Sequence, residues 1–218
     1  MLDERIIELK RKITEFGLLI EKMIDESIAG LLNKNEERLK KVIEDLEEKA
    51  NNFEIEIEEL CIETIAQFEP KAKNLRIILM ILKINNDLER IGDHAVNISE
   101  SSLFLIKRPD VKPLIDIPRM ADESIKMLKD SINSFINEDA EMARNVCYRD
   151  NIVDNLKDQI IRELVTYMIS DPNTIERSLE LIRITQNLER IADLSTNIGE
   201  DVIFITQGKI IKHHIEEK

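Results

Sequence analysis

The sequence contains few of the residues that form tight turns. Its 218 residues include only 5 glycines and 5 prolines, no tryptophan, and 4% aromatic side chains. Because glycine and proline dominate turns, so few of them indicate few turns and therefore long helices. The rest of the composition, which is rich in Glu, Lys, Ile and Leu, favours the same structure. The hydrophobic fraction of 43% is sufficient for a folded core and argues against general disorder.

Paired cysteines and long apolar runs are also missing. Cys61 and Cys147 are isolated, with no CxxC partner and no neighbouring histidine, so we expect buried thiols in a reduced, cytoplasmic protein. No apolar run approaches the roughly 20 residues that a membrane span needs. The N-terminal MLDERIIELKRK is typical of an amphipathic helix start and not of a signal peptide. We expect a cytoplasmic protein that reaches a membrane only through a partner.

The charge and the absent motifs exclude several functions. A net charge of -13 argues against nucleic-acid binding, because a phosphate backbone would be repelled. The same charge is compatible with cation binding or with docking onto a basic partner surface. The sequence has no glycine-rich phosphate loop, no Ser/His/Asp set and no Cys/His set. None of its motifs indicates catalysis.

Apolar residues recur at intervals of three and four, which predicts helices. Pro70 interrupts the pattern once, and the segment KRPDVKPLIDIP, with three prolines, cannot be helix interior and is the expected linker. Asp171 or Asn173 is a candidate cap for the last helix. The six expected helices cover residues 6–28, 36–67, 73–106, 117–136, 140–170 and 174–207.

One phrase occurs twice, a hundred positions apart: LERIGDHAVNI at 88–98 and LERIADLSTNI at 188–198. The matches extend along the whole third helix of each half, from Leu79 and Leu179 to Phe104 and Phe204. We therefore predict an internal duplication. The predicted fold is all-α, with two tandem repeated antiparallel three-helix bundles, residues 1–108 and 109–218, built from six long helices.

The repeated phrase places oxygen side chains at intervals of four, which aligns them along one side of a helix. Counting back from Pro70 reaches Glu47 and Asn51. Counting back from Pro172 reaches Asn151 and Asn155, which adjoin Asp150 and Asp154. We therefore expect an i,i+4 polar pair of the second helix opposite each Glu-xxx-Asp pair. Carboxylate and amide oxygens suit a hard cation, such as magnesium, manganese, calcium or oxidised iron, and zinc also accepts them. The facing residues are Glu47, Asn51, Glu89, Asp93 and Asn97 in the first half and Asp150, Asp154, Glu189, Asp193 and Asn197 in the second.

A second interpretation needs no metal. Arg90 and Arg190 adjoin the acids in sequence, and Lys49 and Lys157 lie on the opposing helices, so interhelical salt bridges could neutralise every carboxylate. The spacing alone favours neither interpretation. His94 has Leu194 as its counterpart, so we interpret it as a surface or boundary histidine. No Glu-xx-His pair is present, which argues against a ferritin-like di-iron centre.

The two repeated phrases, together with FEPKAKNLRIILMILK before the first and LVTYMISDPNTIERSLELIR before the second, resemble the PhoU family. The resemblance covers nearly the whole chain, with both repeats in order. It implies a cytoplasmic accessory protein of phosphate-specific transport and a negative regulator of the phosphate-starvation response. It also implies an adaptor between the phosphate ABC transporter and the sensor histidine kinase, and is compatible with a homodimer.

The resemblance further implies metal ions, namely iron, zinc, manganese or magnesium, bound by Glu/Asp-xxx-Asp pairs. Asn51 departs from that pattern, because an acid would be the stronger ligand. The first site would then bind more weakly or enlist Glu54 or Glu48. The implied ligands are Glu89, Asp93, Glu189, Asp193, Asp150 and Asp154, with Asn97 and Asn197 as supporting polar residues.

Two rival functions remain at this point. A metal-dependent hydrolase acting on phosphate compounds would use two metals and lose hydrolysis with Asp93→Ala or Asp193→Ala. A helical scaffold with salt-bridged acids would keep its cation and partner binding after Glu89→Gln with Glu189→Gln.

Overall fold

A computed structural model describes residues 1–207 of the chain. His213, His214 and the end of the second predicted repeat lie outside the described residues. Two short turns, η1 and η2, are π-helical and 3-10, and α2, η1 and α3 follow one another without a break as one bent rod. The elements are α1 (Leu2–Leu32), α2 (Glu36–Lys41), η1 (Val42–Leu46), α3 (Glu47–Phe68), α4 (Lys73–Leu105), α5 (Asp116–Asn137), α6 (Ala140–Ser170), η2 (Pro172–Thr174) and α7 (Ile175–Gln207).

The helix ends follow the local sequence. The side chains of Asn35 and Asp139 each accept hydrogen bonds from backbone N–H groups of the first turn that follows, in α2 and α6. Asp171, one of the two predicted candidates, caps η2 by accepting from the Asn173 N–H. Glu69 ends α3 in the left-handed conformation, with Pro70 directly after it. These boundaries confirm the predicted all-helical fold with two three-helix repeats.

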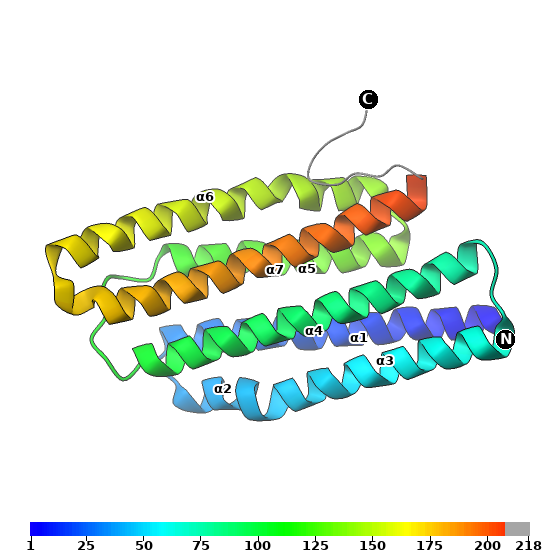
Figure 1. Cartoon of the computed structure of the whole chain (residues 1–218), viewed down its shortest axis with the longest axis horizontal. Helices are drawn as coiled ribbons and strands as arrows, with labels where there is room; N and C mark the ends of the chain where they lie inside the picture. The colour runs from blue at the N-terminus through cyan, green and yellow to red at the C-terminus, as the bar shows by residue number, and fades with distance from the viewer. Residues whose placement is uncertain (208–218) are drawn as a thin grey trace.

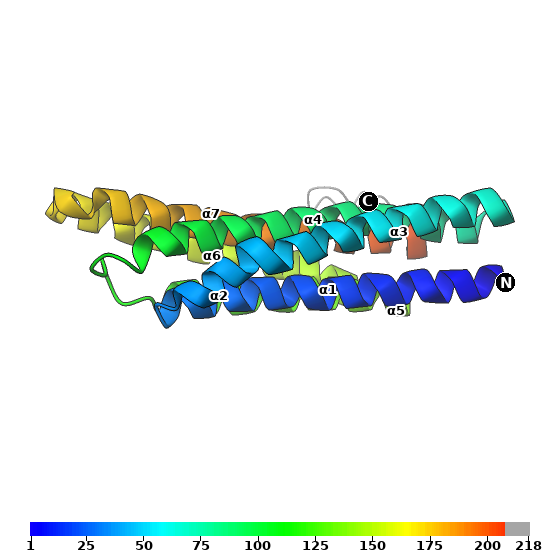
Figure 2. The same cartoon turned by 90° about the horizontal axis from the view of Figure 1, so that it is seen from below.

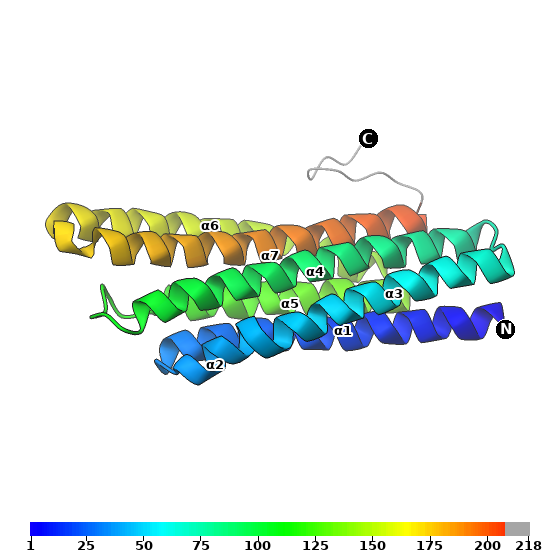
Figure 3. The ribbon, with the colours of Figure 1, turned by 60° about the horizontal axis from the view of Figure 1, so that its bottom comes forward.

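The helices form two layers. Figures 1 and 2 show α3, α4, α7 and α6 side by side in one layer, with α1 and α5 packed beneath them. The repeats meet where α4 packs on α7 and α1 packs on α5, and Figure 3 shows both contacts. Since Lys83 of α4 pairs with Asp201 while the later His94 pairs with the earlier Asn187, α4 and α7 run antiparallel. The two repeats are therefore related by a pseudo-twofold axis through the α4–α7 seam.

A single hydrophobic core runs through both repeats. Phe16 of α1 is fully buried and stacks on Phe53 of α3 with 5.6 Å between ring centroids. Cys61 and Cys147 are buried free thiols, as predicted. Burial raises the pKa of each to about 12, so both thiols stay protonated at neutral pH.

The π-helical turn η1 compensates for one extra residue in the first repeat. Buried Ala50 lies 15 positions after the cap Asn35, whereas buried Val153, its counterpart, lies 14 positions after the cap Asp139. A π turn holds one more residue than an α turn, so the helix absorbs the extra residue before Glu47. As a result the rest of α3 keeps the same register on α4 as α6 keeps on α7.

Candidate functional site

The first carboxylate set comprises Glu47 and Glu54 of α3 with Glu89 and Asp93 of α4. The register between the two helices is fixed by the Asn85 side-chain amide, which donates to the Glu54 carbonyl at 2.9 Å. Asp93 raises the pKa of Glu47, and Asp93 and Glu54 both raise that of Glu89, after burial as the main cause in each case. Each of the four carboxylates therefore lies close enough to at least one other of the set to repel it.

The first set has no basic partner at ion-pair distance. Among residues 1–207 no salt bridge joins Glu47, Glu54, Glu89 or Asp93 to a lysine or arginine. Arg90, which we considered as an internal counter-charge, pairs instead with Asp87 at 3.8 Å. Asn51 is exposed on α3, between Glu47 and Glu54. Within residues 1–207 the first set therefore has no interhelical salt bridge, and the nearby Arg90 charge lowers the pKa of Glu89 without forming an ion pair with it.

The second carboxylate set comprises Asp150 and Asp154 of α6 with Glu189 and Asp193 of α7. Burial first, and then Glu189 and Asp150, raise the pKa of Asp193 to about 6. In contrast to the first set, this one contains a cation. The Lys157 ammonium donates to Asp154 at 2.9 Å and to Glu189 at 3.1 Å. The second repeat thus combines facing carboxylates with the interhelical salt bridge of the second interpretation.

One substitution explains the difference between the sets. Counting from the buried counterparts Ala50 and Val153, Glu54 occupies the position that Lys157 has in the second repeat. Accordingly, Glu54 raises the pKa of Glu89, whereas Lys157 forms an ion pair with Glu189. The carboxylates of the first set therefore repel one another, whereas Lys157 neutralises part of the negative charge of the second set.

The donor atoms fit a hard cation, but the side chains are not arranged as a finished metal site. Carboxylate oxygens at the first set, together with the Asn51 amide oxygen, are the ligands that Mg²⁺, Mn²⁺ and Ca²⁺ prefer. Nevertheless, within residues 1–207 no group of three or more His, Cys, Asp and Glu side chains has the geometry of a metal site. Binding would require the half-buried and exposed carboxylates to change rotamer.

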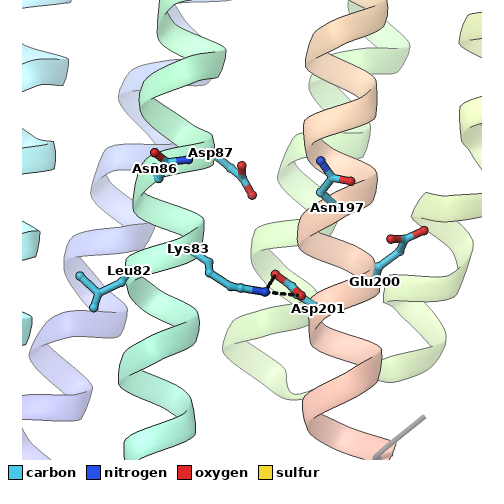
Figure 4. Close-up of a pocket in the computed structure, with 7 residues that line it drawn as sticks. All are labelled: Leu82, Lys83, Asn86, Asp87, Asn197, Glu200 and Asp201. Atoms are coloured by element: carbon cyan, nitrogen blue, oxygen red, sulfur yellow. Dashed lines mark hydrogen bonds and ion pairs between the residues drawn. The ribbon is translucent and has the colours of Figure 1, made fainter. Parts of the chain in front are cut away.

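Asn97 and Asn197 are both exposed, on α4 and α7, and Asn197 lies at the α4–α7 seam. Asn197 lines two seam pockets, the first of which has a volume of about 480 Å³ and is also lined by Lys83, Asp87 and Asp201. In Figure 4 the Asp87 carboxylate extends from α4 toward α7, and Lys83 reaches across to both oxygens of Asp201. His94 is partly buried at the same seam, where its Nδ1 is 2.8 Å from the Asn187 side-chain oxygen.

Of the residues that line the first seam pocket, Asn197 was predicted as a site residue, whereas Lys83, Asp87 and Asp201 were not. Asp87 and Asp201 have Asn187 and Ser101 as repeat counterparts, so they lie outside the pattern that we used to find candidates. An available signal was the break in the repeat itself, since a charge that is present in only one copy marks a position where the two halves differ.

Asp87→Asn is expected to stabilise the protein at neutral pH. Burial, with Asp201 adding and Arg90 and Lys83 opposing, raises the pKa of Asp87 to about 6 from its usual 3.8. A carboxyl group whose folded pKa is raised costs stability once ionised, so the wild type loses stability as pH rises from about 4 to 6. The variant should be more stable by about 1–3 kcal/mol at pH 7.5 and equal at pH 3.5, measured by urea unfolding. A gain that is the same at both pH values would contradict this account.

No helix within residues 1–207 is long and apolar enough to cross a membrane. Together, the fold and the site define a class: all-helical tandem-repeat proteins with carboxylates facing each other across a helix pair in each repeat.

Comparisons with known proteins identify the family. The PhoU domain model matches residues 13–102 and 117–202. The PhoU homolog of Aquifex aeolicus, a phosphate-specific transport system accessory protein, is 38% identical over 212 residues, which cover 97% of this chain and 96% of the relative. PhoU homolog 2 of Thermotoga maritima is 35% identical over 217 residues, covering 100% of this chain and 92% of the relative. The chain belongs to the PhoU family.

Solved structures agree with this assignment. The crystal structure of PhoU from Pseudomonas aeruginosa superposes with a TM-score of 0.91 at 30% identity, covering 95% of this chain and 100% of that one. A phosphate transport system regulatory protein PhoU from Streptococcus pneumoniae has a TM-score of 0.88 at 23% identity, covering 97% and 100%. Because the identity is only 23%, the second comparison supports the fold alone.

Proposed function

We propose that the protein is a cytoplasmic accessory regulator of a phosphate-specific transport system. In this role it bridges the phosphate ABC transporter and a sensor histidine kinase and silences the starvation response when phosphate is ample. The observation that carries the proposal is the similarity over 97% of the chain to a relative named as such an accessory protein. Similarity over both repeats, and not over one domain, supports the same role for the whole chain.

The docking surface in this proposal is the face of the four-helix layer that points away from α1 and α5. Ser27 of α1 hydrogen-bonds the Ala95 carbonyl and Ser99 on the inner side of α4, while Asp93 and Asn97 are exposed on its outer side. The net charge of -13 favours a basic partner surface. Cations held by the carboxylate sets would reduce the charge of this face and thereby adjust docking.

Metal binding belongs to the proposal, with Mg²⁺, Mn²⁺, iron or zinc as candidates. In the first repeat the ligands would be Glu47, Glu54, Glu89 and Asp93, with Asn51 as a neutral donor. Their mutual repulsion supports this assignment, because a bound cation would relieve it. The second set would bind more weakly, since Lys157 already neutralises part of it. The first set is therefore expected to have the higher metal affinity. Asn51 alone predicts the opposite, because an amide is a weaker ligand than the acid that the family pattern has there.

Lys157→Gln is expected to raise the Mn²⁺ affinity of the second set. The change releases Asp154 and Glu189 from their ion pairs and removes a positive charge from the site, which should strengthen binding about tenfold. Isothermal titration with Mn²⁺ measures the effect. Lys49→Gln, which removes an exposed lysine from α3, is the matched control and should leave the affinity of the second set unchanged. Equal affinity in Lys157→Gln and wild type would show that the ion pairs do not limit binding.

Docking is tested with the purified phosphate ABC transporter in detergent or nanodiscs. Replacing Glu89 by Gln and Asp93 by Asn should weaken binding, whereas replacing Glu59 and Glu63, two exposed glutamates of α3, by Gln should leave it nearly unchanged. Autophosphorylation of the kinase, measured with and without the protein, tests the second partner. If both double variants bind the transporter as the wild type does, the carboxylate face is not the docking surface.

The rival hydrolase makes a different prediction from the same residues. It requires hydrolysis of phosphate compounds that needs added metal and disappears in Asp93→Ala and Asp193→Ala. The accessory role requires no such activity. A metal-dependent turnover that both variants abolish would favour the hydrolase.

A further inference from the structure

Exposed apolar residues occupy matching positions of the two repeats. Leu79 of α4 and its repeat counterpart Leu179 of α7 are 49% and 46% exposed. Ile62 of α3 is 56% exposed, and Val165, its counterpart in α6 by the register given above, is 42% exposed. Each repeat therefore presents one apolar site, formed by Ile62 and Leu79 in the first repeat (site 1) and by Val165 and Leu179 in the second (site 2).

The two residues of site 1 lie at nearly the same level of neighbouring helices. The Asn85 side chain donates to the Glu54 carbonyl and so fixes the level of α4 against the antiparallel α3. Leu79 lies six residues before Asn85, and Ile62 lies eight residues after Glu54. Their levels along the bundle therefore differ by only about 3 Å.

Both residues of site 1 point away from α1. Ile62 follows Phe53, which stacks on α1, by nine residues, and nine residues turn a helix by about half a revolution. Leu79 precedes Ser99, which contacts Ser27 of α1, by twenty residues, a rotation of about 200°. Site 1 therefore lies on the outer face of the four-helix layer, and the repeat places site 2 there as well.

The two sites lie at opposite ends of this face. The Lys83–Asp201 ion pair fixes the level of α4 against the antiparallel α7, so Leu79, four residues before Lys83, lies near Phe204, three residues after Asp201. Phe204 is also exposed and adds to site 1. Leu179 lies 25 residues before Phe204 on α7, which places the sites roughly 37 Å apart. The pseudo-twofold axis through the α4–α7 seam relates one site to the other.

Leu18 of α1, in the opposite layer, shows no such duplication. It is more exposed than either leucine of the two sites. Counted back from the caps Asn35 and Asp139, its counterpart in α5 is the exposed Asp122. Single exposed apolar residues are common on protein surfaces, so Leu18 requires no partner. Exposure that is repeated at two positions in both halves points instead to two equivalent contacts.

The outer face between the sites is acidic in both halves. Glu89 and Asp93 of α4 recur as Glu189 and Asp193 of α7, and one arginine follows each glutamate. The acids therefore outnumber the bases in both copies. A complementary surface has two apolar contacts, separated by roughly 37 Å, with basic side chains between them.

We propose that the outer face docks onto a twofold-symmetric pair of identical protein subunits, each of which covers one apolar site and places basic side chains on the adjacent carboxylates. The inference rests on the proposed function and specifies the transporter surface that this face binds. Two identical subunits present the same patch twice about one axis, which matches two equivalent sites about the pseudo-twofold axis. Because one continuous core holds both sites, the second contact forms intramolecularly and strengthens the first.

Site-specific photocrosslinking tests the inference with the purified phosphate ABC transporter in nanodiscs. Benzoylphenylalanine replaces Leu79 in one variant and Leu179 in another, and mass spectrometry identifies the crosslinked residues. Both positions should crosslink to the same segment of the same transporter polypeptide, because each contacts one of two identical subunits. Benzoylphenylalanine in place of Leu18 is the control and should give no crosslink to the transporter, because α1 lies in the opposite layer.

Affinity measurements separate simultaneous use of the sites from alternate use. Leu79→Gln with Ile62→Gln removes site 1. Leu179→Gln with Val165→Gln removes site 2. All four positions are exposed, so the fold should be retained. Each double variant should weaken docking at least about tenfold, because a bivalent contact loses one attachment. A partner that used either site alone would lose only about half its binding, and Leu18→Gln should remain within about twofold of wild type.

Three outcomes would overturn the inference alone while the transporter still docks: crosslinks from the two positions to different segments or to none, crosslinks to a second copy of this chain, or affinities that fall by no more than about twofold in both double variants. Failure of the wild type to dock would overturn the inference and the proposed function together. Matching crosslinks with no effect on autophosphorylation of the kinase would leave the inference standing and remove the adaptor role.

Discussion

Deleting Glu44 is expected to leave the stability of the protein nearly unchanged, whereas deleting Glu59 should destabilise it strongly. Both residues are exposed glutamates of the same bent rod, so the two variants have the same composition. Glu44 lies in η1, where losing one residue converts the π turn into the α-helix that the second repeat has. Glu59 lies in α3, where one deletion turns the neighbouring segment by about 100°. Buried Ile57 or Cys61 then leaves the core, at a cost of several kcal/mol.

Urea unfolding followed by circular dichroism measures both variants. The Glu44 deletion should change the free energy of unfolding by about 1 kcal/mol or less, in either direction. The Glu59 deletion should lower it by more than about 4 kcal/mol. Glu44→Ala and Glu59→Ala control for loss of the side chain alone. Equal destabilisation by the two deletions would refute the view that η1 absorbs the extra residue.

Mn²⁺ should stabilise the wild-type protein. A ligand that binds only the folded state at a hundred times its dissociation constant adds about 2.7 kcal/mol, which corresponds to about 5–10 °C in melting temperature for a chain of this length. The first carboxylate set should account for most of the gain, because no ion pair competes there. Glu89→Gln with Asp93→Asn should therefore abolish most of the shift.

In the absence of metal, the variant with Glu89→Gln and Asp93→Asn should be more stable than the wild type. Removing two of four mutually repelling carboxylates relieves the repulsion that raises the pKa of Glu47 and Glu89. Differential scanning calorimetry of EDTA-treated protein, with and without added Mn²⁺, measures both the metal-free stability and the metal-induced shift. Glu58→Gln with Glu59→Gln controls for the change in net charge. A metal-induced shift of the same size in both variants would locate the cation elsewhere.

The fold was predictable because the relevant signals are local. The spacing of apolar residues predicted the helices, and the prolines and capping residues predicted where they end. The duplication of LERIGDHAVNI predicted the two repeats. The hairpin turn at Pro70 also fixed which side chains of α3 face α4, because two long helices joined by a short loop have little freedom in register. The count from Pro70 predicts that Glu47 faces Asp93, and in the structure Asp93 raises the pKa of Glu47.

Other features depend on tertiary contacts, which the spacing of residues along the sequence does not reveal. The turn η1 shows only when the two repeats are compared residue by residue, since neither alone reveals the extra position. Lys157 was named as one possible counter-charge, but its pairing with Glu189, and the presence of Glu54 at the matching position, required the register of both helix pairs. The α4–α7 seam joins residues a hundred positions apart, so no local pattern could place Asp87 or Asp201 there.

We propose that side-chain oxygens on α3 and α4 converge to bind a cation. The most direct measurement is paramagnetic broadening of backbone amide NMR signals as Mn²⁺ is added to metal-free protein. Signals from Glu47–Glu54 and from Glu89–Asp93 should broaden first and together, before those of Glu56–Glu63, which carries four glutamates. Broadening that begins evenly along all acidic segments, or that spares Glu89 and Asp93, would contradict it.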